Sequence, residues 1–166
     1  MKKIIIMLMV FAPMSLFAQK FGHVDSQAIM QSLPEVSKIS GELEAKAKEY
    51  ENELQSMQKE FQLKFDEYEK SASTMNETKR KEVETELQQM NQKIQETYQQ
   101  HQQDLAKLQQ EKMQPITNKL INAINNVGKA GGYVYIMDKA AGIPYISETL
   151  SKDVTADVKA ELNKLK

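Results

Sequence analysis

Two histidines are the side chains of this sequence best suited to take part in catalysis or metal binding, and one of them lies near an aspartate. His23 and Asp25 are two residues apart in a segment that alternates like a strand, so they would share one face, but no third group is evident beside them. His101 lies alone in a helical pattern, where we expect a structural role. The chain has no Cys, which excludes thiolate nucleophiles and Cys-ligated zinc. We therefore expect no catalytic, metal-binding or cofactor-binding residue.

A basic segment is the other candidate site. Residues 70–81 hold four bases and one acid, whereas residues 42–69 hold nine acids and four bases and residues 82–114 hold six acids and three bases. A positive segment of this kind could steer a negatively charged partner or an anionic lipid surface; alternatively, its cations pair locally with neighbouring glutamates. The candidate contact residues are Lys70, Met75, Lys79, Arg80 and Lys81. The overall net charge of −1 argues against a nucleic-acid partner.

Two long helices are expected to position this segment. No Gly or Pro occurs in residues 42–114, and apolar side chains recur there every three or four residues, which is typical of a coiled-coil seam. The first seam contains Val36, Ile39, Leu43, Ala47, Tyr50, Leu54, Met57, Phe61, Phe65 and Tyr68, and the second contains Val83, Leu87, Met90, Ile94, Tyr98, His101, Leu105 and Leu108.

The two helical patterns are separated by a weak helix-forming stretch at residues 71–75. The three- or four-residue spacing of apolar side chains stops there. Thr74 followed three residues later by Glu77 is the pattern of a capping box, which marks a new helix start. We therefore expect residues 41–114 to form an antiparallel hairpin arm with its tip near 71–75, and not the alternative single rod. Folding back at this point would place the basic segment at the tip.

Both ends of the chain are expected to build a small body, from residues 19–40 and 115–166. Residues 21–25 and 133–137 predict strands, residues 142–147 predict a third strand or edge, and residues 27–33 and 155–165 predict short helices, with Ser26 capping the first. Such a small sheet is marginal alone, so oligomerisation would complete it. The resulting class is α+β, mostly α. Pro115, where the arm would meet the body, predicts a hinge or, alternatively, a helix boundary.

Residues 1–18 have the composition of a secretory signal peptide. Two lysines precede an apolar run that ends at Phe17 and Ala18, and the run is shorter than a membrane-spanning helix requires. We expect cleavage near Ala18 and export from the cytoplasm, to the periplasm if the family resemblance described below holds; the alternative is an uncleaved anchor.

Several short motifs resemble the Skp/OmpH family of periplasmic chaperones when they are taken in order. They are Phe21-Gly22-His23-Val24-Asp25-Ser26-Gln27 with Ile29, Pro115-Ile116 with Lys119-Leu120, Gly131-Gly132-Tyr133, Tyr135-Ile136-Met137-Asp138-Lys139, and Asp153-Val154-Thr155 with Val158. Together with the intervening helices they cover essentially the whole mature chain. One departure is that the arms here are acidic and glutamine-rich rather than broadly basic.

The resemblance implies a jellyfish-like homotrimer in which three strand groups join into a β-barrel body and three helical hairpins project from it. It also implies an ATP-independent holdase that binds unfolded outer-membrane β-barrel proteins and prevents their aggregation before membrane insertion. The rival interpretation is an exported coiled-coil spacer or adaptor that binds a folded partner, because a heptad seam fits both.

Overall fold

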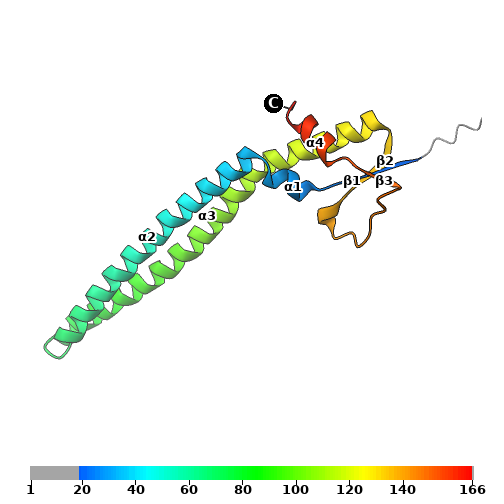
Figure 1. Cartoon of the computed structure of the whole chain (residues 1–166). Coiled ribbons are helices and arrows are strands. Elements are labelled where there is room, and N and C mark those ends of the chain that lie inside the picture. Colours follow the sequence, from blue (N-terminus) through cyan, green and yellow to red (C-terminus); the bar gives the residue numbers. More distant parts are fainter. Residues whose placement is uncertain (1–18, 166) are drawn as a thin grey trace, which may run out of the picture.

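The protein, described by a computed structural model over residues 19–165, consists of a long two-helix arm and a small body at one end of it (Figure 1). The arm is formed by α2 (Pro34–Ser71) and most of α3 (Glu77–Gly131). The body contains β1 (Lys20–Val24), α1 (Ser26–Gln31), β2 (Tyr133–Asp138), the 3-10 turn η1 (Lys139–Ala141), β3 (Ser151–Asp153) and α4 (Thr155–Leu162). The expected signal peptide lies outside the described residues.

The helices α2 and α3 run antiparallel, which confirms the predicted hairpin and shows that the single rod was wrong. Polar contacts join the helices along their length, from Lys112 and Glu42 near the body to Lys64 and Glu86 near the tip. The seam is narrow: within residues 41–114, only Leu87 and His101 are fully buried. The arm therefore has very little core of its own.

The turn at the tip was predicted at the right place, but its cap was not. The second helix begins at Glu77, and its cap is Asn76, whose side chain accepts a hydrogen bond from the Lys79 N–H at 2.8 Å. The Thr74 hydroxyl instead donates to the Ser71 carbonyl at 2.9 Å. The predicted capping box is thus wrong, because Asn76 is the residue directly before the first turn and reaches its unpaired N–H groups.

The sheet has the order β2-β1-β3, and both outer strands run parallel to β1. This arrangement brings together three parts of the chain that are far apart in sequence. The core beneath the sheet is contributed by β1, α1, α3, α4 and the residues directly before α2 and α4, and its buried members are Val24, Ile29, Leu33, Leu120, Ala123, Val154, Val158 and Leu162. The body is therefore stabilised by long-range packing.

Three local predictions in the body need correction. Residues 142–147 form no strand: Gly142 has a left-handed φ of 71° and Pro144 has no N–H to donate, so the third strand is Ser151–Asp153 instead. The cap of α1 is Asp25, which accepts from the Ala28 N–H at 2.8 Å, and not Ser26. The last helix ends at Leu162.

Pro115 lies inside α3, so the alternative of a helix boundary was wrong. The helix continues for sixteen residues to Gly131. The proline ring removes the backbone donor that would bond the Glu111 carbonyl. Figure 1 shows the axis of α3 changing direction where the helix passes from the arm into the body.

Candidate functional site

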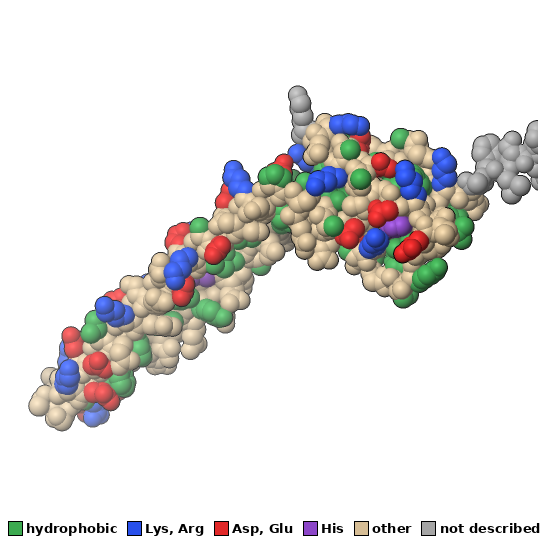
Figure 2. Space-filling model, viewed as in Figure 1, with side chains coloured by type: hydrophobic (Ala, Val, Ile, Leu, Met, Phe, Trp, Pro, Cys, Tyr) green, Lys and Arg blue, Asp and Glu red, His purple; other side chains and the backbone are tan. Residues whose placement is uncertain are grey.

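The body exposes several large apolar side chains. Val134, Tyr135 and Met137 on β2 are 57%, 46% and 41% exposed, and Tyr145 and Leu150 in the following loop are 79% and 75% exposed. We call these five residues the body apolar surface. Figure 2 shows hydrophobic side chains gathering at the end of the body farthest from the arm tip. The outer edge of β2 has no strand partner within residues 19–165, and exposed apolar groups of this size beside such an edge are typical of an interaction surface.

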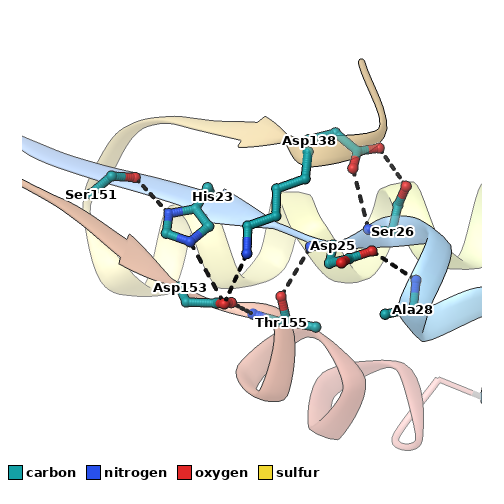
Figure 3. Close-up of polar contacts among 9 residues, drawn as sticks. His23, Asp25, Ser26, Ala28, Asp138, Ser151, Asp153 and Thr155 are labelled. Atoms are coloured by element: carbon teal, nitrogen blue, oxygen red, sulfur yellow. Dashed lines mark hydrogen bonds and ion pairs between the residues drawn. The ribbon is translucent and has the colours of Figure 1, made fainter. Parts of the chain in front are cut away.

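A polar cluster lies beside this surface and links β1 to β3 (Figure 3). His23 lies opposite Asp153 in the parallel register, and its Nδ1 is 2.9 Å from the Ser151 Oγ. The other ring nitrogen, Nε2, is 3.6 Å from the Asp153 carboxylate, and Lys139 approaches the same carboxylate at 3.6 Å. The imidazole thus bridges two residues of β3.

Hydrogen bonds from Thr155 fix the aspartate of this cluster. The side chain and the backbone N–H of Thr155 lower the pKa of Asp153, and the charges of Lys139 and His23 act in the same direction. On the other side of β1, the Ser26 hydroxyl donates to Asp138 at 2.5 Å, which ties α1 to the end of β2.

Sequence analysis missed Ser151 and Asp153 as neighbours of His23. Their two-residue spacing on one strand matches the alternation of β1, but only the register of the two parallel strands could reveal the contact. Asp25, which was expected to share a face with His23, caps α1 instead.

The Ser151, His23 and Asp153 grouping lacks the geometry of a serine hydrolase. The hydroxyl bonds Nδ1, the carboxylate is 3.6 Å from Nε2, and His23 is only 7% exposed. A substrate could not reach this imidazole, and the pairing of acid and nucleophile with the ring nitrogens is inverted relative to the usual triad. The cluster therefore acts as a clasp that holds the two strands in register.

The basic residues at the arm tip are paired locally. Lys79 contacts Glu82 at 3.2 Å, Arg80 contacts Glu84 at 3.7 Å, and Lys81 contacts Glu77 at 2.9 Å. Each pair lies within one turn of the same helix, as the alternative interpretation of this segment anticipated.

Two other candidate residues flank the turn. Lys70 lies in the last turn of α2 and makes no ion pair with any residue in 19–165, and Met75 is half-buried in the turn.

Two polar contacts between the helices of the arm also shift the pKa of a side chain on α2. A hydrogen bond from Lys112 on α3 lowers the pKa of Glu42 on α2. Near the tip, the hydrogen bond to Glu84 raises the pKa of Tyr68. Both contacts cross between the helices and supplement the narrow seam.

The described residues hold neither a candidate metal site nor a membrane-spanning helix. Residues 19–165 contain no group of three or more His, Asp or Glu side chains placed to hold a metal ion. Within the same range, no helix combines the length and the apolar character needed to cross a bilayer.

Comparison with known proteins gives consistent matches over nearly the whole described chain. The family model for outer membrane protein (OmpH-like) matches residues 20–162. The chaperone protein Skp of Yersinia enterocolitica is 30% identical over 147 residues, which cover 89% of this chain and 88% of that protein. A crystal structure of a candidate outer membrane chaperone (OmpH-like) from Caulobacter crescentus superposes with a TM-score of 0.72, covering 88% of this chain and 85% of that one at 16% identity.

The structural match supports the fold, and the sequence matches decide the family. A helical hairpin on a small mixed body, the clasp between its distant strands and a family match across residues 20–162 agree with one another. The chain belongs to the OmpH-like outer membrane protein family, whose membership supports a chaperone role.

Proposed function

We propose that this protein is an ATP-independent periplasmic holdase that binds unfolded outer-membrane β-barrel proteins and prevents their aggregation before membrane insertion. The observation that carries the proposal is the division of the molecule into a sparsely packed two-helix arm and a body with an exposed apolar surface. An arm with little core of its own can bend around clients of different shape. The family relationship points to the same function.

The body apolar surface is proposed to join three copies of the chain. The sheet has three strands, and within residues 19–165 the outer edges of β2 and β3 have no strand partner. Pairing across these edges would bury the exposed side chains of β2 and complete a β-barrel-type body. Three arms would then project from one platform and enclose a client between them.

Client contact at the tip is assigned to Lys70, Met75, Lys79, Arg80 and Lys81. Since three of these cations already have local partners, we expect their aliphatic stems and Met75 to contribute as much as their charge. An anionic lipid surface is the other proposed contact of the tip. Pro115 is proposed as the hinge that lets the arm swing.

Export is the remaining part of the proposal. Residues 1–18 would direct the chain to the periplasm and be removed there, since their basic start and short apolar run fit a cleaved signal. N-terminal sequencing of the protein purified from a periplasmic extract would test this directly.

The decisive experiment is dilution of a denatured porin with and without the mature protein, followed by light scattering. A holdase suppresses scattering without nucleotide at a ratio of one trimer to one client, whereas a coiled-coil spacer leaves scattering unchanged. Analytical ultracentrifugation of the same sample distinguishes a trimer from a monomer or dimer. If the protein is a monomer and still suppresses scattering, the proposed holdase activity stands and the proposed trimeric β-barrel-type body is wrong.

The tip is tested in the same assay with Lys70, Lys79, Arg80 and Lys81 changed to Gln. Slower capture and a weaker salt dependence would support steering by charge. Unchanged capture and unchanged salt dependence would show that steering by charge at the tip is wrong.

A further inference from the structure

A buried histidine lies at the middle of the arm and has no role in the proposed chaperone cycle. His101 on α3 is 8% exposed, and it is one of the two buried side chains in residues 41–114. Polar side chains are rarely buried unless they have partners, because removing them from water is costly. Its surroundings should therefore explain why it is kept there.

The imidazole is held by α2 through its face and one edge. Its ring stacks on Tyr50 with a centroid separation of 3.8 Å and an interplanar angle of 7°. Its Nε2 lies 3.2 Å from the Glu53 carboxylate. The other nitrogen, Nδ1, is buried and has no hydrogen-bond partner among the described residues.

The charged groups around His101 come from both helices of the arm. On α2, Glu53 contacts the ring directly, and Lys46 lies 4.7 Å from the centroid of Tyr50. Lys46 is itself paired with both oxygens of Glu49, each at 2.9 Å. On α3, Asp104 accepts from the Tyr50 hydroxyl at 3.5 Å. Carboxylates therefore outnumber ammonium groups around the imidazole, and the one nearby ammonium already has a carboxylate partner.

We propose that His101, Tyr50 and Glu53 form an acid-responsive clasp, in which protonation of His101 holds α2 and α3 together more tightly at mid-arm. Protonation gives the imidazole a positive charge, which turns its contact with the Glu53 carboxylate into an ion pair and places a cation over the face of Tyr50. Nδ1 lacks a partner in either form, as a bare lone pair or as an N–H. The clasp would couple arm stiffness to the acidity of the surroundings.

The test is amide hydrogen exchange of residues 46–57 and 97–108 at pH 7.5 and pH 5.5, corrected for intrinsic exchange. In the wild-type protein, protection should rise about two- to fivefold on acidification, a modest range because Glu53 is half-exposed. His101→Gln should abolish that rise, and Glu53→Gln should reduce it, because only the stacking of the protonated imidazole on Tyr50 then remains. The matched control is Glu51→Gln, which removes a carboxylate of the same helix that pairs with Lys48 and should keep the full rise.

Two outcomes would overturn the proposed acid-responsive clasp at His101. One is an equal rise in wild type and His101→Gln, and the other is a full rise in Glu53→Gln. If the arm amides of the His101→Gln variant exchange without protection at both pH values, the result for Glu53→Gln decides, because that variant keeps the imidazole. The chain has only one other histidine, His23 in the body, so the two imidazole resonances can be assigned and followed through the same pH range by NMR.

Discussion

The arm and the body of this protein are held together in opposite ways. The body buries eight side chains that come from both ends of the chain, whereas residues 41–114 of the arm bury two and rely on contacts within a turn or directly across the hairpin. Hydrophobic burial concentrated in one end produces a rigid platform, and its scarcity along the helices leaves a compliant rod. A single helix, α3, extends from the arm into the body and so joins the two regions.

The largest expected effect is loss of body packing. Ile29 is completely buried, so Ile29→Ala should destabilise the protein by about 2–5 kcal/mol through lost burial and the cavity that remains. Urea unfolding followed by circular dichroism would measure the change. A loss below about 1 kcal/mol would mean that the body core is not the dominant source of stability.

A smaller and more local effect is expected in the arm seam. Leu87 is 7% exposed and Leu63 is 57% exposed on the same hairpin. Leu87→Ala should cost about 2–3 kcal/mol and raise amide exchange in the outer half of the arm, whereas Leu63→Ala should change stability by less than about 0.5 kcal/mol. Equal effects of the two substitutions would contradict the seam as described.

The helix start at the tip allows a third comparison. Asn76→Ala should cost about 1 kcal/mol, because it leaves the Lys79 N–H without its partner. Thr74→Ala is the control and should have little effect, since its hydroxyl bonds a carbonyl in the turn. Exchange of the first-turn amides of α3 measures both, and a larger effect from Thr74 would restore the capping box predicted from sequence.

The smallest expected effect is a pH dependence of the body. Because the folded pKa of Asp153 is lowered, its contribution is complete above about pH 4 and is lost as the pH falls further. Asp153→Asn should therefore reduce the drop in thermal midpoint between pH 5 and pH 3. Since this carboxylate is about half exposed, the difference should be small. An identical drop in the variant would assign acid sensitivity to other carboxylates.

These comparisons also indicate which features could be read from the sequence. The arm was predictable because its information is local: the three- and four-residue spacing of apolar side chains and the absence of Gly and Pro determine two helices without reference to the rest of the chain. The strand at Tyr133–Asp138 was predictable for the same reason, since its aromatic and β-branched residues favour extended backbone.

The body site could not be read in this way. Ser151 and Asp153 are more than a hundred residues from His23, and a three-residue strand has almost no local signal. The register that unites them is imposed by the core, in which Val154 and Val158 pack against Val24 and Ile29. Residues 142–147 contain more strand-forming side chains but remain outside the sheet, because Gly142 adopts a left-handed φ and Pro144 has no N–H to donate.

By itself, the amino-acid sequence determined the two helices, the reversal between them and the concentration of apolar residues at the two ends of the chain, since each follows from spacing and propensity within a few turns. Only the tertiary structure decided which segment becomes the third strand and which side chains meet His23 and His101. Those outcomes depend on competition between distant segments for the same hydrogen bonds and the same buried space. A pattern within a few residues of sequence cannot predict the result of that competition.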